Sequence, residues 1–181
     1  LFYGGLVRQK NVLSIIMQSL LIVGAVSILW VAFGYSFVFG SSLMETDSVW
    51  RHFIGGFDKL FLQGITTSSL TTGRIPELMF VLFQCMFAVI TPALILGAFA
   101  ERVKFAGFLM FTVLWSILVY IPMAHWVWGG GFLKQMGAID FAGGTVVHIN
   151  AGIAALVMAI LIGKRRDYKI GHPMAPHNIT F

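Results

Sequence analysis

Four long, almost uncharged stretches constrain the fold of this chain more than any other feature. They cover roughly residues 12–39, 78–100, 105–125 and 144–163, and residues 1–6 resemble the end of a fifth. A helix that crosses a bilayer needs about 20 consecutive, mostly apolar residues. Of the 181 residues, 58% are hydrophobic and only 10% are charged. A soluble domain carries about 25% charged residues, so lipid is the predicted solvent.

These spans predict an all-α integral membrane protein, a helical bundle over residues 1–181 with no separate soluble domain. The connection 40–77 is the only long one, and its amphipathic middle, "VWRHFIGGFDKLFLQG", predicts a short interfacial helix. The chain starts at Leu1 rather than Met and stops within "GHPMAPHNITF", which reads as a loop. We therefore expect it to be a fragment of a longer protein.

Basic residues gather in three of the connections. Arg8 and Lys10, Arg102 and Lys104, and the basic residues of 164–169 account for eight of the twelve Lys and Arg, while the opposite side holds five of the seven acids. The positive-inside rule predicts a multi-pass protein of the cell membrane, with these three connections in the cytoplasm and Asp140 outside. Because the cations lie at span ends and not along one face, nucleic acid is not an expected partner.

His148 is conspicuous because ionisable residues are otherwise almost absent from the spans. Such a residue usually faces a cavity or a partner, although a neutral imidazole bonded to a backbone carbonyl is the alternative. Asn150 points to a different helix face. Asp140 precedes "FAGG" and a helix, where an N-cap residue belongs. A carboxylate there also reverses the field of the helix N-terminus, so the mouth of the span would tolerate a cation.

Aromatic residues accompany the outer ends of the spans. Phe83 and Phe87 are four residues apart, so they share one helix face, and Trp126 and Trp128 lie in "HWVWGGG". Core packing, lipid contact or an interfacial belt explains each of them. Alternatively, two aromatic faces at one outer mouth would hold a small cation. The single cysteine, Cys85, predicts a packed side chain; no metal cluster or catalytic grouping is visible, so no cofactor and no enzyme activity are expected.

These segments together resemble one family. "DFAGGTVVHINAGIAALVMAILIGKR" is similar to the signature segment of the ammonium transporter (Amt/MEP) family. "LFYGGLVRQKNVLS", "FQCMFAVITPALILGAFAERVKF" and "YIPMAHWVWGGGFL" are similar to its other well-marked segments, in the same order. The resemblance implies the N-terminal five-span half of an inverted-repeat fold, with its first span truncated. It also implies a homotrimer of subunits that each have about eleven spans and their own pore.

The resemblance also implies roles for single residues. Trp128 and Phe87 belong to the outer site that recruits ammonium, Phe87 is the outer half of a phenylalanine gate, and Phe83 lines the same vestibule. His148 is the first of a pair of pore histidines, and Asp140 acts structurally and electrostatically near the recruitment site. The second histidine and the second gate phenylalanine belong to the other half of the fold, so we expect this chain to form only half a pore.

The function implied is transport of ammonium, which is recruited at the aromatic site, deprotonated, and passed as ammonia through a hydrophobic pore. An ammonium sensor of the same fold is one alternative, often with an attached cytosolic signalling domain. A Rhesus-like gas channel is another, although the tryptophan before "GGG" is typical of the Amt branch. A purely structural membrane module is disfavoured by the pattern of Asp140, His148, Phe87 and Trp128. A cytosolic PII-type regulator is a further implied partner.

Overall fold

The computed structural model describes residues 2–41, 43, 48–71, 73–165, 168 and 175–178. These residues form helices joined by loops, with a single isolated bridge between Leu70 and Pro76, so the all-α prediction is confirmed. Four helical segments are long and apolar enough to cross a membrane, and each overlaps one of the predicted spans. They are Gln9–Phe39, Glu77–Phe99, Phe105–Gln135 and Gly144–Ile162.

The first membrane-length segment is built from several pieces. A short helix α1 (Phe2–Leu6) and one 3₁₀ turn (Gln9–Asn11) precede α2 (Val12–Leu29). α2 continues through a π-helical turn (Trp30–Gly34) into α3 (Tyr35–Phe39). A π turn inserts an extra residue into the helical repeat and so redirects the side chains that follow it.

The next two long helices pack against the first. α4 (Glu77–Phe99) runs without a break despite Pro92. α5 (Phe105–Trp115) joins α6 (Ile121–Val127) through a second π turn, Ser116–Tyr120. Proline has no N–H to donate, so a proline inside a helix leaves a carbonyl of the preceding turn unpaired. Pro122 is the second residue of α6, separated from the π turn by Ile121, and a widened turn just before a proline relieves that mismatch.

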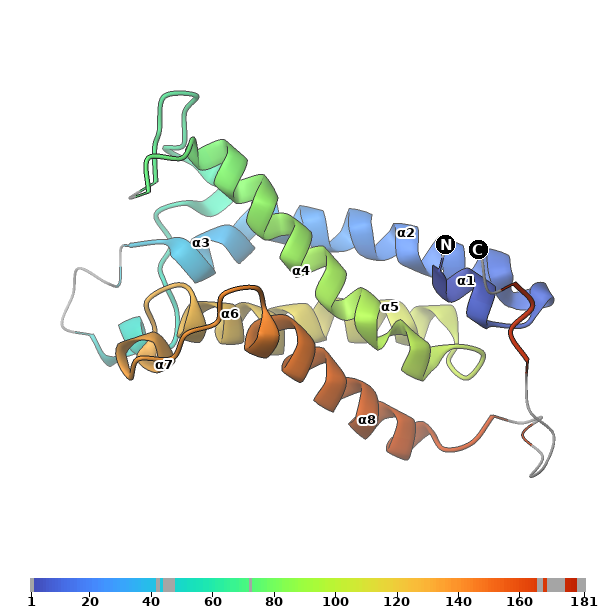
Figure 1. Cartoon of the computed structure of the whole chain (residues 1–181). Coiled ribbons are helices and arrows are strands. Elements are labelled where there is room, and N and C mark those ends of the chain that lie inside the picture. The colour runs from blue at the N-terminus through green and yellow to red at the C-terminus, as the bar shows by residue number, and fades with distance from the viewer. Residues whose placement is uncertain are drawn as a thin grey trace.

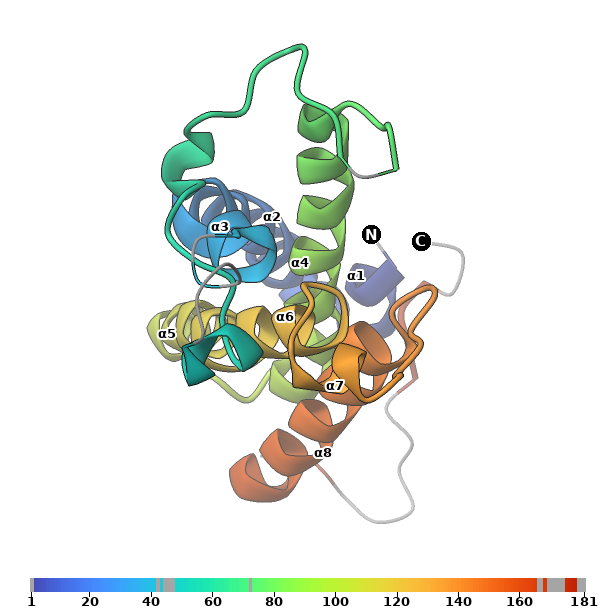
Figure 2. The same cartoon turned by 90° about the vertical axis from the view of Figure 1, so that its left-hand side faces the viewer.

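The last span starts with a third π turn. After α6 the chain forms the short helix α7 (Phe132–Gln135), and the π turn Gly144–Ile149 then leads into α8 (Asn150–Ile162). Figure 1 shows α4 lying across the bundle between α2 and α8, and α4 contacts both of them. Figure 2, viewed from the end where α3, α6 and α7 gather, shows the chain entering α8 beside α6 and α7.

The three basic connections meet at the other end of the bundle. The Glu101 carboxylate lies 3.0 Å from Arg8 Nε and 3.5 Å from Arg165 Nη1, which joins all three connections. Both chain ends lie at this end in Figure 1. The described residues of these three connections therefore lie together at one end of the bundle, whereas Arg166 and Lys169 of the basic set lie outside the described residues.

The predicted interfacial helix in connection 40–77 is wrong. Residues 49–64 form only two short 3₁₀ turns, Val49–His52 and Leu60–Leu62. Between them the chain packs on the end of α3, where Gly55 N donates to Phe37 O at 2.7 Å. A Cβ atom at Gly55 would lie only 2.9 Å from Gly40 O. This close backbone packing outweighs the amphipathic pattern that favoured a helix.

A few isolated polar contacts lie inside the bundle, whereas its exterior is apolar. Trp30 Nε1 donates to Val81 O at 3.1 Å, and Cys85 is buried with its Sγ 3.6 Å from Ser27 Oγ, so its predicted packing is confirmed. Large apolar side chains on the long helices are exposed, as expected for a surface that faces lipid. They include Leu13, Leu20, Ile28, Met110, Leu118, Leu156 and Ile160.

Candidate functional site

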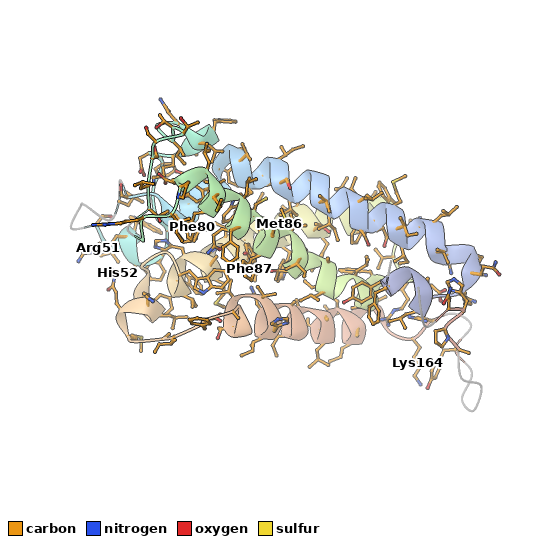
Figure 3. All side chains as sticks on the ribbon, turned by 45° about the horizontal axis from the view of Figure 1, so that its top comes forward. Arg51, His52, Phe80, Met86, Phe87 and Lys164 are labelled. Carbon is orange, nitrogen blue, oxygen red and sulfur yellow. The ribbon has the colours of Figure 1, made fainter. Side chains whose placement is uncertain are left out.

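Three aromatic rings, two from α4 and one from the residue that follows α6, form a continuous cluster. The Phe83 and Phe87 ring centroids are 5.1 Å apart with an interplanar angle of 83°, and the Phe87 and Trp128 centroids are 5.5 Å apart at 63°. The rings therefore meet edge to face and are not stacked in parallel. Phe87 projects from the middle of α4 (Figure 3), whereas Trp128 immediately follows α6. Phe83 is 57% exposed, so one face of the cluster is open on this chain.

Trp126 is separate from this cluster. Its ring packs on Phe132 at 5.2 Å between centroids, and its Nε1 donates to Phe53 O at 3.2 Å. Two residues on, the Trp128 ring turns instead toward Phe87. The pair thus offers two half-buried tryptophans with different surroundings, of which only Trp128 contacts Phe87.

A tight reversal after α6 sets the direction of Trp128. Gly129 N and Gly131 N both donate to His125 O at 3.0 Å. A Cβ atom at Gly129 would lie 2.0 Å from Val38 O, so a larger residue does not fit. The predicted reversal at these glycines is therefore confirmed, and it depends on their lack of a side chain.

His125 joins this reversal to other segments at the same end of the bundle. Its ring is completely buried, with Nδ1 2.8 Å from Val38 O and Nε2 2.9 Å from Arg51 O. The imidazole therefore joins α6 to the end of α3 and to the connection before α4. Sequence reasoning gave His125 no role, because both contacts come from residues more than seventy positions away.

Asp140 caps the helix that carries His148. Its Oδ1 accepts hydrogen bonds from Gly143 N at 2.8 Å and Gly144 N at 2.7 Å, and its Oδ2 accepts from Thr145 N and Val146 N, both at 2.9 Å. One carboxylate thus satisfies four N–H groups that a helix N-terminus leaves free. The predicted capping of this helix is confirmed, and the negative charge lies at the positive end of the helix dipole.

The backbone of Asp140 connects this cap to the aromatic cluster. Trp128 Nε1 donates to Asp140 O at 2.9 Å. Gly143 has a left-handed φ of 85°, and a Cβ atom there would lie 2.8 Å from Val147 Cγ2 and 3.8 Å from Phe87 Cδ1. Gly143 therefore lies directly against Phe87, and both its backbone angle and its surroundings require glycine.

His148 lies one π turn after Gly143 along the span. Its backbone N donates to Gly143 O at 3.0 Å, within the π turn, and its side chain is exposed on this chain. Asn150 is buried with Nδ2 3.3 Å from Val146 O, so the two side chains occupy different faces, as predicted. π turns inside α-helices occur frequently at functional sites.

The described residues hold no group of three or more His, Cys, Asp or Glu side chains that could bind a metal ion. The site instead offers aromatic faces, one carboxylate that caps a helix, and an imidazole one turn further along the span. Aromatic faces attract cations, and an imidazole accepts or donates a proton near neutral pH. The arrangement suits a small cation that can lose a proton.

Comparisons with known proteins agree over the whole chain. The family model of the Ammonium Transporter Family matches residues 1–181. An ammonium transporter of Bacillus subtilis is 50% identical over 184 residues, covering 100% of this chain and 42% of that protein. An ammonium transporter of Aquifex aeolicus is 46% identical over 180 residues, covering 99% of this chain and 40% of that protein.

Solved structures show the same likeness. The crystal structure of Mep2 from Candida albicans matches with a TM-score of 0.77 at 33% identity, covering 99% of this chain and 39% of that one. The crystal structure of Mep2 from Saccharomyces cerevisiae matches with a TM-score of 0.77 at 32% identity. The chain thus spans about two fifths of the length of the relatives it matches.

Proposed function

Because the chain belongs to the Ammonium Transporter Family, we propose that the complete protein carrying it transports ammonium across a membrane. The single observation that carries this proposal is the placement of the Phe87 and Trp128 rings, 5.5 Å apart, at the capped start of the span that bears His148. The names of the relatives from Bacillus subtilis and Aquifex aeolicus support ammonium as the substrate.

The aromatic cluster is suited to recruiting the ion but not to carrying it. Each cation–π contact contributes about 0.5–2 kcal/mol. Transfer of an unpaired ammonium ion into hydrocarbon costs on the order of tens of kcal/mol by a Born estimate. Contacts with Phe87 and Trp128 cannot offset that cost. The ion must therefore lose its charge before it enters the apolar part of the span.

His148 is positioned to take part in that step. We assign it the relay of the proton and a hydrogen bond to neutral ammonia. The imidazole accepts the ammonium proton at one ring nitrogen and releases the proton of its other ring nitrogen, so the ring is neutral again after the transfer. Asp140 favours approach of the cation at the mouth through its negative charge, although four N–H donors already engage its carboxylate. Phe83 extends the aromatic wall on the open side of the cluster.

The rest of the assembly is proposed on the family relationship. The relatives are more than twice as long as this chain, and their remaining length would supply the opposite wall of the pore. We propose a homotrimer of complete subunits, with the basic connections at Arg8, Arg102 and Lys164 in the cytoplasm and Asp140 outside. A PII-type regulator would then meet the protein at the basic end.

The two tryptophans provide a matched test of recruitment. In proteoliposomes containing the complete protein, we expect Trp128→Leu to raise the ammonium concentration at half-maximal current about twofold to thirtyfold, the loss of one cation–π contact. Trp126→Leu removes the same side chain outside the cluster and should leave that concentration unchanged. Trp128→Phe keeps an aromatic face and should fall between Trp128→Leu and the unmodified protein.

The same experiment separates the alternatives. A protein that binds ammonium but gives no transport would be a sensor and would contradict the proposal. Equal effects of Trp128→Leu and Trp126→Leu would show that the aromatic cluster does not recruit the ion.

A further inference from the structure

The end of the bundle opposite the aromatic cluster contains a pocket with three cationic side chains. Arg102, Lys104 and Lys164 line a cavity of about 450 Å³, together with Glu101 and two apolar residues, Val103 and Ile162. Figure 3 shows Lys164 at the far end of the bundle from Arg51 and His52. The pocket lies where α4 ends, α5 begins and α8 ends, so membrane-length helices surround it.

The one carboxylate of the pocket is committed to other partners. Glu101 accepts hydrogen bonds from Arg8 N at 3.3 Å and Arg8 Nε at 3.0 Å, and from the Asn11 amide. Arg165 Nη1 is a further cation, 3.5 Å from its Oε2. Since Glu101 is shared among these groups outside the cavity, it does not neutralise the three cations that line the cavity.

Arg102 is held in place with part of its guanidinium unused. Its Nη1 donates to Gly163 O at 2.6 Å, while its buried Nε has no hydrogen-bond partner among the described residues. Burial and the nearby charge of Arg165 both lower the pKa of the Arg102 guanidinium. An anion bound in the pocket would relieve this crowding of positive charge.

We propose that this pocket binds a phosphate-bearing anion, supplied by the membrane as the headgroup of an anionic phospholipid. Guanidinium forks and ammonium groups are the side chains that bind phosphate oxygens in proteins. Basic pockets between spans at the membrane surface bind anionic headgroups in this manner. Val103 and Ile162 provide apolar walls on which the start of the lipid tail can lie.

The proposal is independent of ammonium transport. Neither the aromatic cluster nor His148 lines this pocket, and its ligand would not cross the membrane. A protein without ammonium-driven current could still bind the headgroup. Failure of one proposal therefore leaves the other testable.

The exposed lysines allow a test with little risk to folding. We would titrate the complete protein, in uncharged detergent, with dioctanoyl phosphatidylglycerol and measure binding by calorimetry. Lys104→Gln and Lys164→Gln should each weaken binding roughly fivefold, and together roughly thirtyfold, the effect expected for juxtamembrane cations. Lys10→Gln removes an exposed lysine at the same end but outside the pocket and should change binding less than twofold.

Three further ligands identify the source of the phosphate. Dioctanoyl phosphatidylcholine should bind weakly, because its headgroup carries no net charge. Tighter binding of phosphatidylglycerol than of glycerol phosphate or inorganic phosphate supports the lipid, whereas equal or tighter binding of those ions supports a phosphate site with a soluble source. The proposal is overturned if no phosphate compound binds, or if Lys10→Gln weakens binding as much as the pocket variants do.

Discussion

Asp140 holds two parts of the candidate site together through different atoms. Its carboxylate accepts hydrogen bonds from four backbone N–H groups at the start of the last span, while its backbone oxygen accepts one from Trp128 Nε1. The position of "D-F-A-G-G" before an apolar run was enough to predict the cap. The link to Trp128 was not predictable, because it depends on how two separate segments fold back on one another.

We expect Asp140→Asn to lower the stability of the complete protein by about 1–2 kcal/mol, because an amide offers one oxygen and places its NH₂ group against backbone N–H donors. Asp140→Glu keeps the charge but moves the oxygens away from these donors. If capping is the main role, Asp140→Glu should also be destabilised in thermal unfolding in detergent. Unchanged melting temperatures for both variants would contradict the capping role.

At the scale of elements, the π turns and the glycine reversal decide which side chains meet. Apolar length predicted where the spans lie, and the glycine run predicted the reversal after α6. The π turns were not predicted, because the apolar runs continue through them without a change in composition. The same limit applies to residues 49–64, where close backbone packing at Gly55 prevents the helix that the pattern favoured.

Gly143 offers a test at this scale, with Gly152 as its control. Gly143→Ala places a Cβ atom 2.8 Å from Val147 Cγ2 on a backbone with a φ of 85°. The left-handed angle alone costs about 1–2 kcal/mol, so we expect at least that loss of stability in thermal unfolding. At Gly152 no atom of the described residues lies within 4 Å of the added atom, so Gly152→Ala should be neutral or stabilising by up to about 1 kcal/mol. Equal effects at the two positions would contradict the placement of Gly143 against its neighbours.

At the scale of the whole molecule, polar contacts between distant segments hold the helices together at both ends of the bundle. His125 joins α6 to α3 and to the long connection at one end, and Glu101 joins the three basic connections at the other. Neither role could be predicted from the sequence, because each depends on segments that are distant in the chain. The sharing of one end by the basic connections was predictable from the order of the spans, each of which crosses once.

Glu101 makes stability depend on pH. Burial opposes ionisation of its carboxyl group, but hydrogen bonds from Arg8 and Asn11 outweigh burial and lower its pKa below the ordinary value of 4.5. The carboxylate therefore stabilises the fold above that ordinary value, and the contribution is lost as the pH falls through the lowered pKa. We expect Glu101→Gln to be less stable than the unmodified protein at neutral pH, by about 1–3 kcal/mol.

In thermal unfolding at a series of pH values, the difference between Glu101→Gln and the unmodified protein should shrink in the acid range. A difference that stays constant from neutral pH to well below the ordinary glutamate pKa would contradict the assignment of the effect to the ionised carboxylate.

Ammonium transport of the proposed kind requires a hydrophilic ion to give up its charge before it crosses an apolar path. The most direct test is the current evoked by an ammonium gradient in proteoliposomes that contain the complete protein with His148→Ala, with an unchanged melting temperature as proof of folding. We expect this current to be abolished. A current as large as that of the unmodified protein would show that the imidazole at position 148 relays no proton.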